Sequence, residues 1–152
     1  MIRVLVADDA RAARALLRAI LEQVPEIEVV GEAADGAQAV ALTLTLRPDV
    51  VTMDVRMPGK DGLAAIEEIM ARAPTPVVVV TGVSGAEHQE TAFRALQLGA
   101  VEVLPKPSDT EPGRFGREAE AIRLAVRGVA GLTVIVAVPL SAEPALFDTR
   151  TQ

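Results

Sequence analysis

The chain has 152 residues, no cysteine and a net charge of −6, and half of its residues are hydrophobic, which fits one globular domain and excludes disulfides and thiolate metal sites. Because its 15 basic residues are spread along the chain, we expect no direct binding to nucleic acid. The apolar runs are too short to span a membrane and the first residues, MIRVLVADD, are unlike a signal peptide, so we expect a soluble cytoplasmic protein without membrane insertion.

Short aliphatic strands alternate with amphipathic helices along most of the chain. The apolar pattern predicts strands at 2–7, 27–30, 50–53, 77–80 and 101–104, and helices at 12–24, 36–46, 63–71 and 87–98. Strands and helices that alternate in this way form a parallel sheet, because right-handed crossovers place the helices on both faces. The sequence therefore predicts an α/β fold with a doubly wound, five-stranded parallel sheet.

The composition changes after Pro107. A polar, turn-rich stretch at 108–116 is interpreted as a linker or long loop, and a further helix is expected at 117–129. We take residues 1–127 as the folded domain and 128–152 as a C-terminal extension or linker remnant. Its apolar run at 132–138 is interpreted as a sixth strand, an edge extension or a partner-binding segment, followed by a disordered tail. Because an exposed strand edge invites pairing, a homodimer through this extension is a further hypothesis.

Polar side chains follow the strands of the predicted sheet. Asp8 and Asp9 follow the first strand, Asp54 the third, Thr81 the fourth and Lys106 the fifth. The carboxyl ends of parallel strands meet at one edge of a doubly wound sheet, where ligands bind. Three carboxylates remain ionised together only with a compensating cation, and oxygen ligands of this kind favour Mg²⁺. An aspartate beside Mg²⁺ can attack a phosphoryl donor, so Asp54 is the candidate phosphoacceptor.

Thr81 and Lys106 complete the candidate site. Lys106 would pair with phosphoryl oxygens as a point charge, and the Thr81 hydroxyl would donate a hydrogen bond to one of them. Each residue alone has a simpler interpretation, because a strand-end Asp often caps a helix, Thr is common in turns and Lys is usually solvated. Their occurrence at successive strand ends favours a shared site.

The chain resembles the receiver domain of two-component response regulators over about residues 1–127. The resemblance rests on VADD at 6–9, MDVRMPGKDG at 53–62, VVVVTG at 77–82 and LGAVEVLPKP at 98–107. It implies a flavodoxin-like sheet with strand order 2-1-3-4-5, a histidine kinase as phosphodonor and a downstream output protein as partner.

The same resemblance implies roles for individual residues. Mg²⁺ would be held by Asp8, Asp9, Asp54 and the backbone carbonyl of Arg56. Asp54 would be phosphorylated, and Thr81 and Lys106 would sense the phosphoryl group. The peptide between Lys106 and Pro107 would be cis.

Among receivers, the segments DVVTMDVRMPGKDGLAAIEEIM and PTPVVVVTG are most similar to the N-terminal domain of chemotaxis protein-glutamate methylesterases. The leading hypothesis is therefore a phosphoryl-accepting switch of a chemotaxis-type pathway. The alternative is a regulatory fragment of a methylesterase that lacks its hydrolase domain. A serine hydrolase needs a histidine base, and the single histidine, His88, lies within the receiver. We therefore expect only self-phosphorylation and self-dephosphorylation, and no methylesterase triad in these residues.

Position 103 departs from the family pattern. Most receivers carry an aromatic residue three positions before the lysine, and its ring moves together with the threonine. Val103 stands at this switch position. Because valine has no ring to rotate, we expect a smaller conformational response to phosphorylation.

Three arginines lie on one side of the first predicted helix. Arg11, Arg14 and Arg18 follow one another at spacings of three and four residues, which places their side chains on the same face. The pattern indicates either a surface for an acidic partner, such as a kinase domain, or a solvated helix face.

Overall fold

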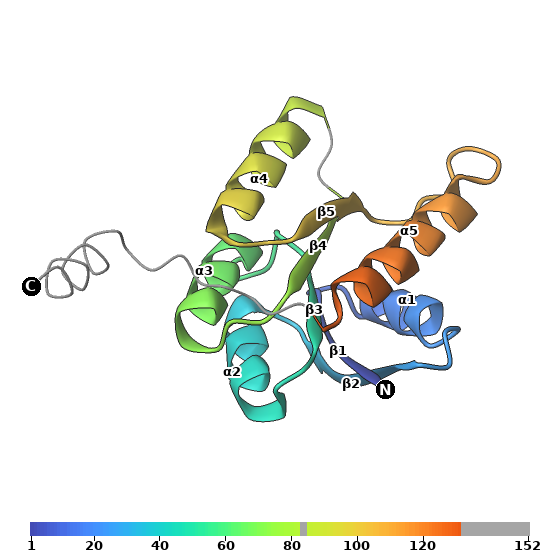
Figure 1. Cartoon of the computed structure of the whole chain (residues 1–152). Helices are drawn as coiled ribbons and strands as arrows, with labels where there is room; N and C mark the ends of the chain where they lie inside the picture. The colour runs from blue at the N-terminus through green and yellow to red at the C-terminus, as the bar shows by residue number, and fades with distance from the viewer. Residues whose placement is uncertain (83–84, 132–152) are drawn as a thin grey trace, which may run out of the picture.

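The computed structural model describes residues 1–82 and 85–131. Within these ranges, one parallel sheet of order β2-β1-β3-β4-β5 is formed by β1 (Ile2–Ala7), β2 (Ile27–Ala33), β3 (Val50–Met53), β4 (Val77–Thr81) and β5 (Glu102–Pro105). The helices there are α1 (Arg11–Leu21), α2 (Gly36–Leu46), α3 (Gly62–Arg72), α4 (Gly85–Leu98) and α5 (Arg114–Val129). Figure 1 shows α1 and α5 on one side of the sheet, with α2, α3 and α4 on the other. The predicted doubly wound fold and its strand order are confirmed.

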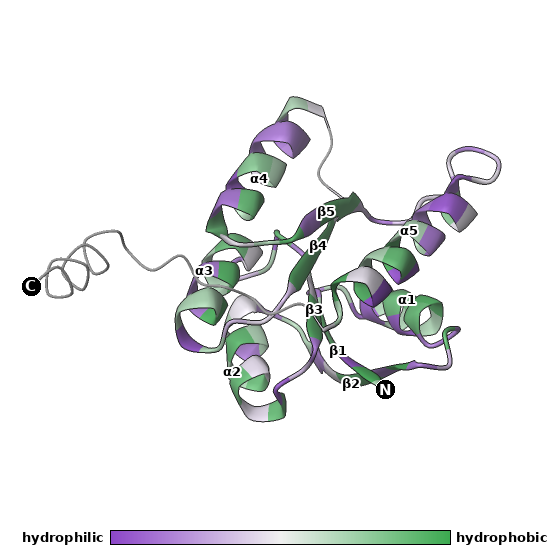
Figure 2. Cartoon of the chain, viewed as in Figure 1, coloured by the Kyte–Doolittle hydropathy of each residue, from purple (hydrophilic) through white to green (hydrophobic). Residues whose placement is uncertain are grey.

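The central strands are buried on both faces. In β4, Val77 and Val79 pack into the cluster formed with α2, α3 and α4, whereas Val78 and Val80 pack into the cluster formed with α1 and α5. Figure 2 shows the resulting hydrophobic colour along β3 and β4. Burial on both faces explains why these strands are continuous aliphatic runs.

No helix in the described part of the chain is long and apolar enough to cross a membrane.

The pairing register between β1 and β3 brings two acidic residues together. Ala7 pairs with Met53, the last residues of the two strands. The following residues, Asp8 and Asp54, therefore leave the sheet side by side. The Asp54 amide donates a hydrogen bond to the Ala7 carbonyl at 2.9 Å, which continues the ladder into the loop.

The pairing register between β4 and β5 brings Thr81 and Lys106 together. Thr81 pairs with Pro105, and the Lys106 amide donates a hydrogen bond to the Thr81 carbonyl at 3.1 Å. Because β3 lies between β1 and β4, both pairs reach the same edge of the sheet. The sheet order and the two registers thus place all the sequence-predicted polar residues at one edge.

The predicted boundaries of α1 and β2 each differ from the structure by three residues. α1 ends at Leu21 instead of residue 24, because the Val24 amide bonds to the Leu21 carbonyl and turns the chain towards β2. β2 continues to Ala33, which pairs with Ala7 of β1. Apolar periodicity does not reveal either of these backbone hydrogen bonds.

The start of α5 also differs from the prediction. α5 begins at Arg114 instead of residue 117, so the polar loop before it is shorter than expected. Glu118 accounts for the difference: it accepts hydrogen bonds from the Ser108 amide at 2.9 Å and from Arg114 Nε at 3.0 Å. These polar contacts tie the loop to the first turn of the helix.

The last helix of the described residues packs into the core. α5 runs to Val129, whose side chain is buried in the cluster with α1. The division of the chain at residue 127 stays a prediction, and the run at 132–138 lies outside the described residues.

The expected cis peptide between Lys106 and Pro107 is wrong, because no peptide bond in the described residues is cis. The trans form is the more stable one for an X–Pro bond, by about 0.5–1 kcal/mol.

α3 begins in close contact with the loop that follows Asp54. The Asp61 side chain caps the helix by accepting a hydrogen bond from the Ala64 amide at 2.9 Å. The Gly62 amide donates to the Val55 carbonyl at 2.8 Å. A Cβ atom at Gly62 would lie 2.0 Å from the Asp54 carbonyl oxygen. Only glycine permits this approach, so the start of α3 helps to fix the loop at Asp54.

We expect Gly62→Ala to destabilise the domain by about 1–3 kcal/mol, the usual cost of forcing an extra methyl group into a packed site. The matched control is Gly116→Ala in α5, because a Cβ atom there has no neighbour within 4 Å. This control should be neutral or stabilise the helix by up to about 1 kcal/mol. Urea unfolding measures both, and equal effects of the two substitutions would contradict the packing described.

Candidate functional site

Three carboxylates converge at the carboxyl edge of the sheet. Asp8, Asp9 and Asp54 each offer an oxygen atom, and these atoms all lie within 4.8 Å of one another. Asp8 is 0% exposed and Asp54 is 5% exposed, whereas Asp9 is open to solvent. The cluster therefore has two buried acids and one acid at its rim.

Lys106 is the cation that faces the two buried acids. Its Nζ atom lies 2.8 Å from Asp8 Oδ2 and 3.1 Å from Asp54 Oδ2. Burial acts to lower the pKa of Lys106, but the hydrogen bond to Asp8 and the charges of Asp54 and Asp8 outweigh it and raise the pKa. Lys106 therefore stays charged and offsets part of the negative charge.

The charge of Asp54 is only partly compensated. Burial raises its pKa, and the neighbouring charge of Asp8 acts in the same direction. Lys106 and the Val55 amide, which donates to Asp54 Oδ1 at 2.8 Å, act in the opposite direction without cancelling the rise. A single ammonium group is thus insufficient for two buried carboxylates, and a divalent cation would complete the compensation.

A cavity of about 300 Å³ opens above Asp54. It is lined by Asp9, Asp54, Arg56, Thr81, Gly82 and Lys106. Thr81 is 1% exposed and lies at the end of β4, as the sequence predicts. The structure therefore brings the predicted metal-binding, phosphoacceptor and sensing positions to one cavity, with Asp8 buried beside them.

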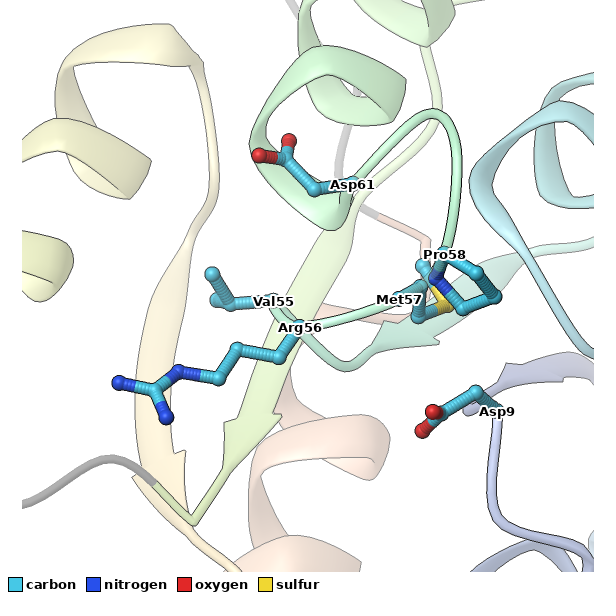
Figure 3. Close-up of a pocket in the computed structure, with 6 residues that line it drawn as sticks. All are labelled: Asp9, Val55, Arg56, Met57, Pro58 and Asp61. Atoms are coloured by element: carbon cyan, nitrogen blue, oxygen red, sulfur yellow. The ribbon is translucent and has the colours of Figure 1, made fainter.

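A neighbouring cavity of about 510 Å³ lies between Asp9 and the residues that precede α3. It is lined by Asp9, Val55, Arg56, Met57, Pro58 and Asp61 (Figure 3). The Arg56 side chain extends away from Asp9 in this view. Its guanidinium forms an ion pair with Glu87 in the first turn of α4. The side chain of Arg56 is thus not paired with the three carboxylates, and only its backbone is a candidate metal ligand.

The predicted switch position lies on β5. Val103 is half-buried, pairs in register with Val79 and packs against the cluster formed with α2, α3 and α4. Valine is branched at Cβ and stiff, so this side chain has few rotamers to exchange.

Two of the three arginines on α1 are partnered within the chain. Arg14 Nε donates to Glu32 Oε1 at 3.0 Å, and Arg18 Nε donates to Glu32 Oε2 at 3.0 Å. Burial acts to raise the pKa of Glu32, but the hydrogen bonds and charges of both arginines lower it below its usual value. Both side chains are therefore ion-paired within the chain, and the surface for an acidic partner stays a prediction.

The role of Arg14 was missed by the sequence prediction. Its Nη1 atom donates to the backbone carbonyl of Asp8 at 2.7 Å. The spacing of Arg14 and Arg18 showed that their side chains share a face of the helix, but not that Glu32 of β2 lies opposite. That contact depends on the packing of α1 against β2.

The family of the chain follows from a comparison with known proteins. Residues 4–113, well over half of the chain, match the response regulator receiver domain. The chain belongs to the response regulator receiver domain family. Receiver domains generally bind Mg²⁺ in an acidic pocket, and this receiver has an aspartate cluster formed by Asp8, Asp9 and Asp54.

Curated relatives of this receiver are protein-glutamate methylesterases/protein-glutamine glutaminases. The one numbered 4 from Geobacter metallireducens is 43% identical over 145 residues, which cover 95% of this chain and 42% of the relative. The one numbered 2 from Anaeromyxobacter dehalogenans is 49% identical over 136 residues, which cover 88% and 38%. The receiver thus spans about two fifths of the length of these relatives.

A solved structure of a related domain also resembles this receiver. The response regulator domain of Thermotoga maritima CheB matches with a TM-score of 0.78 and 36% identity, over 88% of this chain and 98% of that domain. This receiver is therefore of the type found in CheB-like chemotaxis regulators.

Proposed function

We propose that this receiver is a phosphoryl-accepting switch of a chemotaxis-type two-component pathway and that a histidine kinase phosphorylates it on Asp54. One observation carries the assignment of the acceptor. Asp54 is the buried carboxylate that directly follows the central strand β3; its Oδ2 atom lies 3.1 Å from Lys106 Nζ, and it lines a cavity. Asp8 is covered and Asp9 stands at the rim, so Asp54 combines access from the cavity with a fixed cation.

The chemistry is a direct phosphoryl transfer. A carboxylate oxygen of Asp54 attacks the phosphorus of a phosphohistidine, so that an O–P bond forms and the donor's P–N bond breaks. The leaving imidazole keeps the electron pair of that bond. The Lys106 ammonium then pairs with a phosphoryl oxygen, and the Thr81 hydroxyl donates a hydrogen bond to another.

The donor set at the edge of the sheet fits Mg²⁺. Asp8, Asp9, Asp54 and the Arg56 carbonyl would be its ligands, and all of them are the hard oxygen atoms that this cation prefers. The two buried carboxylates share one ammonium group, so a divalent cation would relieve their repulsion. When bound, Mg²⁺ supplies charge neutralisation for the phosphoryl group in flight.

A second candidate function is the regulatory part of a protein-glutamate methylesterase. It is favoured by the relatives, which carry that enzyme name and extend well beyond the matched region. An esterase reading frame fused directly downstream of this receiver in its gene would support this candidate, and an unrelated downstream gene would oppose it.

The remaining partners and the location are predictions. We expect a downstream output protein and a cytoplasmic location, where a chemotaxis-type kinase would act. The homodimer hypothesis finds no support, because the segment at 132–138 on which it rests lies outside the described residues.

Phosphorylation can be tested with acetyl phosphate and intact-mass spectrometry. We expect wild-type protein to gain one phosphoryl group with Mg²⁺ and none in EDTA, because the transferring charge must be neutralised. Asp54→Asn should gain none, whereas the matched control Asp109→Asn, an exposed carboxylate outside the site, should behave like wild type. An adduct on Asp54→Asn, or none on wild type, would contradict the proposed acceptor.

The response to phosphorylation can be tested with beryllofluoride as the phosphoryl mimic. Because Val103 has no ring to rotate, free and beryllofluoride-bound crystal structures should differ little at β5 and α4. Val103→Phe, which restores a ring on β5, should enlarge the difference. A large rearrangement of the loops after β4 and β5 in the wild type would show that the switch does not need an aromatic ring.

A further inference from the structure

Arg14 links the acidic turn of the site to the edge strand of the sheet. Its Nη1 atom donates to the Asp8 carbonyl oxygen at 2.7 Å, and its Nε atom donates to Glu32 Oε1 at 3.0 Å. The side chain is only 15% exposed. The mostly buried guanidinium of Arg14 therefore connects the Asp8 backbone, between β1 and α1, to Glu32 near the end of β2.

The turn that carries Asp8 and Asp9 has few other side-chain supports. Ala10, the residue before α1, makes no side-chain capping bond. The Ala10 amide donates to Asp8 Oδ1 at 2.9 Å, and the Asp8 amide donates to the Ala33 carbonyl at 2.9 Å. Arg14 extends back from the first turn of α1. Among the described side chains, it is the one that donates a hydrogen bond to the Asp8 carbonyl.

We propose that Arg14 is a positioning residue for the metal site. It fixes the Asp8 carbonyl so that the carboxylates of Asp8 and Asp9 stay directed towards Asp54. The inference rests on the proposed function, because it concerns the Mg²⁺ that the three carboxylates would hold. Residues that orient metal ligands without touching the metal typically change its affinity about 10- to 100-fold when they are mutated.

Glu32 makes this arrangement possible. A guanidinium close to the acidic cluster would by itself oppose the binding of a second cation. Both Arg14 and Arg18 pair with Glu32, which offsets part of their charge and holds the guanidinium plane of Arg14. Arg14 can therefore act through geometry rather than through its charge.

Arg18 provides a matched control. It lies on the same helix and binds the same glutamate, with Nη2 2.9 Å from Glu32 Oε2. Its remaining contacts are the Val29 carbonyl at 3.4 Å and the Glu22 carboxylate at 3.6 Å, away from the acidic turn. Loss of Arg18 removes two ion pairs and a cation without releasing the Asp8 carbonyl.

The experiment compares wild type, Arg14→Ala, Arg14→Lys and Arg18→Ala. The dissociation constant for Mg²⁺ is measured by isothermal titration calorimetry, and the unfolding of each protein is measured in EDTA. Arg14→Ala should bind Mg²⁺ about tenfold more weakly, whereas Arg18→Ala should bind it like wild type despite a comparable loss of stability. Arg14→Lys should stay impaired, because lysine keeps the charge but lacks the planar fork that joins Asp8 to Glu32.

Three results would overturn the inference: unchanged Mg²⁺ affinity in Arg14→Ala, an equal loss of affinity in Arg18→Ala, or full recovery in Arg14→Lys. If Arg14→Ala fails to fold, the Mg²⁺ affinities of Arg14→Lys and Arg18→Ala are compared instead, and the inference requires that only Arg14→Lys binds Mg²⁺ more weakly than wild type. Absence of Mg²⁺ binding by wild type would overturn the metal site of the proposed function as well. Wild-type binding with an unaffected Arg14→Ala variant would overturn this inference alone.

Discussion

The mutual repulsion of three carboxylates is the constraint on which this receiver depends. Asp8, Asp9 and Asp54 lie within 4.8 Å of one another, and two of them are buried. Like charges so close together repel one another, and burial together with the charge of Asp8 raises the pKa of Asp54. Lys106 supplies one positive charge in the structure. The proposed Mg²⁺ would supply the remaining charge, and the proposed phosphorylation of Asp54 depends on the same compensation.

The fold holds these charges together by backbone geometry. The β1–β3 and β4–β5 registers bring the acids and the lysine to one edge, and aliphatic layers on both faces of the sheet keep the strands in place. Gly62 lets α3 press against the carbonyl of Asp54, and Arg14 holds the carbonyl of Asp8. Two of the carboxylates are therefore positioned through their own main chain, in addition to the contacts that their oxygens make with Lys106.

Much of the fold and the site could be predicted, because local pattern and chain order determine them. Aliphatic runs that end in Asp8, Asp54 or Thr81 give both the strand and the edge at which its polar residue lies. What could not be predicted depends on contacts between distant segments: Glu118 moves the start of α5, and Glu32 partners two arginines. The cis peptide before Pro107 was carried over from the family resemblance and is absent from the described residues.

The most direct test of the repulsion at the site is the free energy of unfolding of wild type and Asp54→Asn, each with EDTA and with Mg²⁺, at pH 7. If the carboxylates repel one another, Asp54→Asn is more stable than wild type in EDTA, because one buried charge has been removed. Added Mg²⁺ then stabilises wild type strongly and the variant much less. An Asp54→Asn protein that is less stable than wild type in EDTA, and equally stabilised by Mg²⁺, would contradict the central role given to this charge cluster.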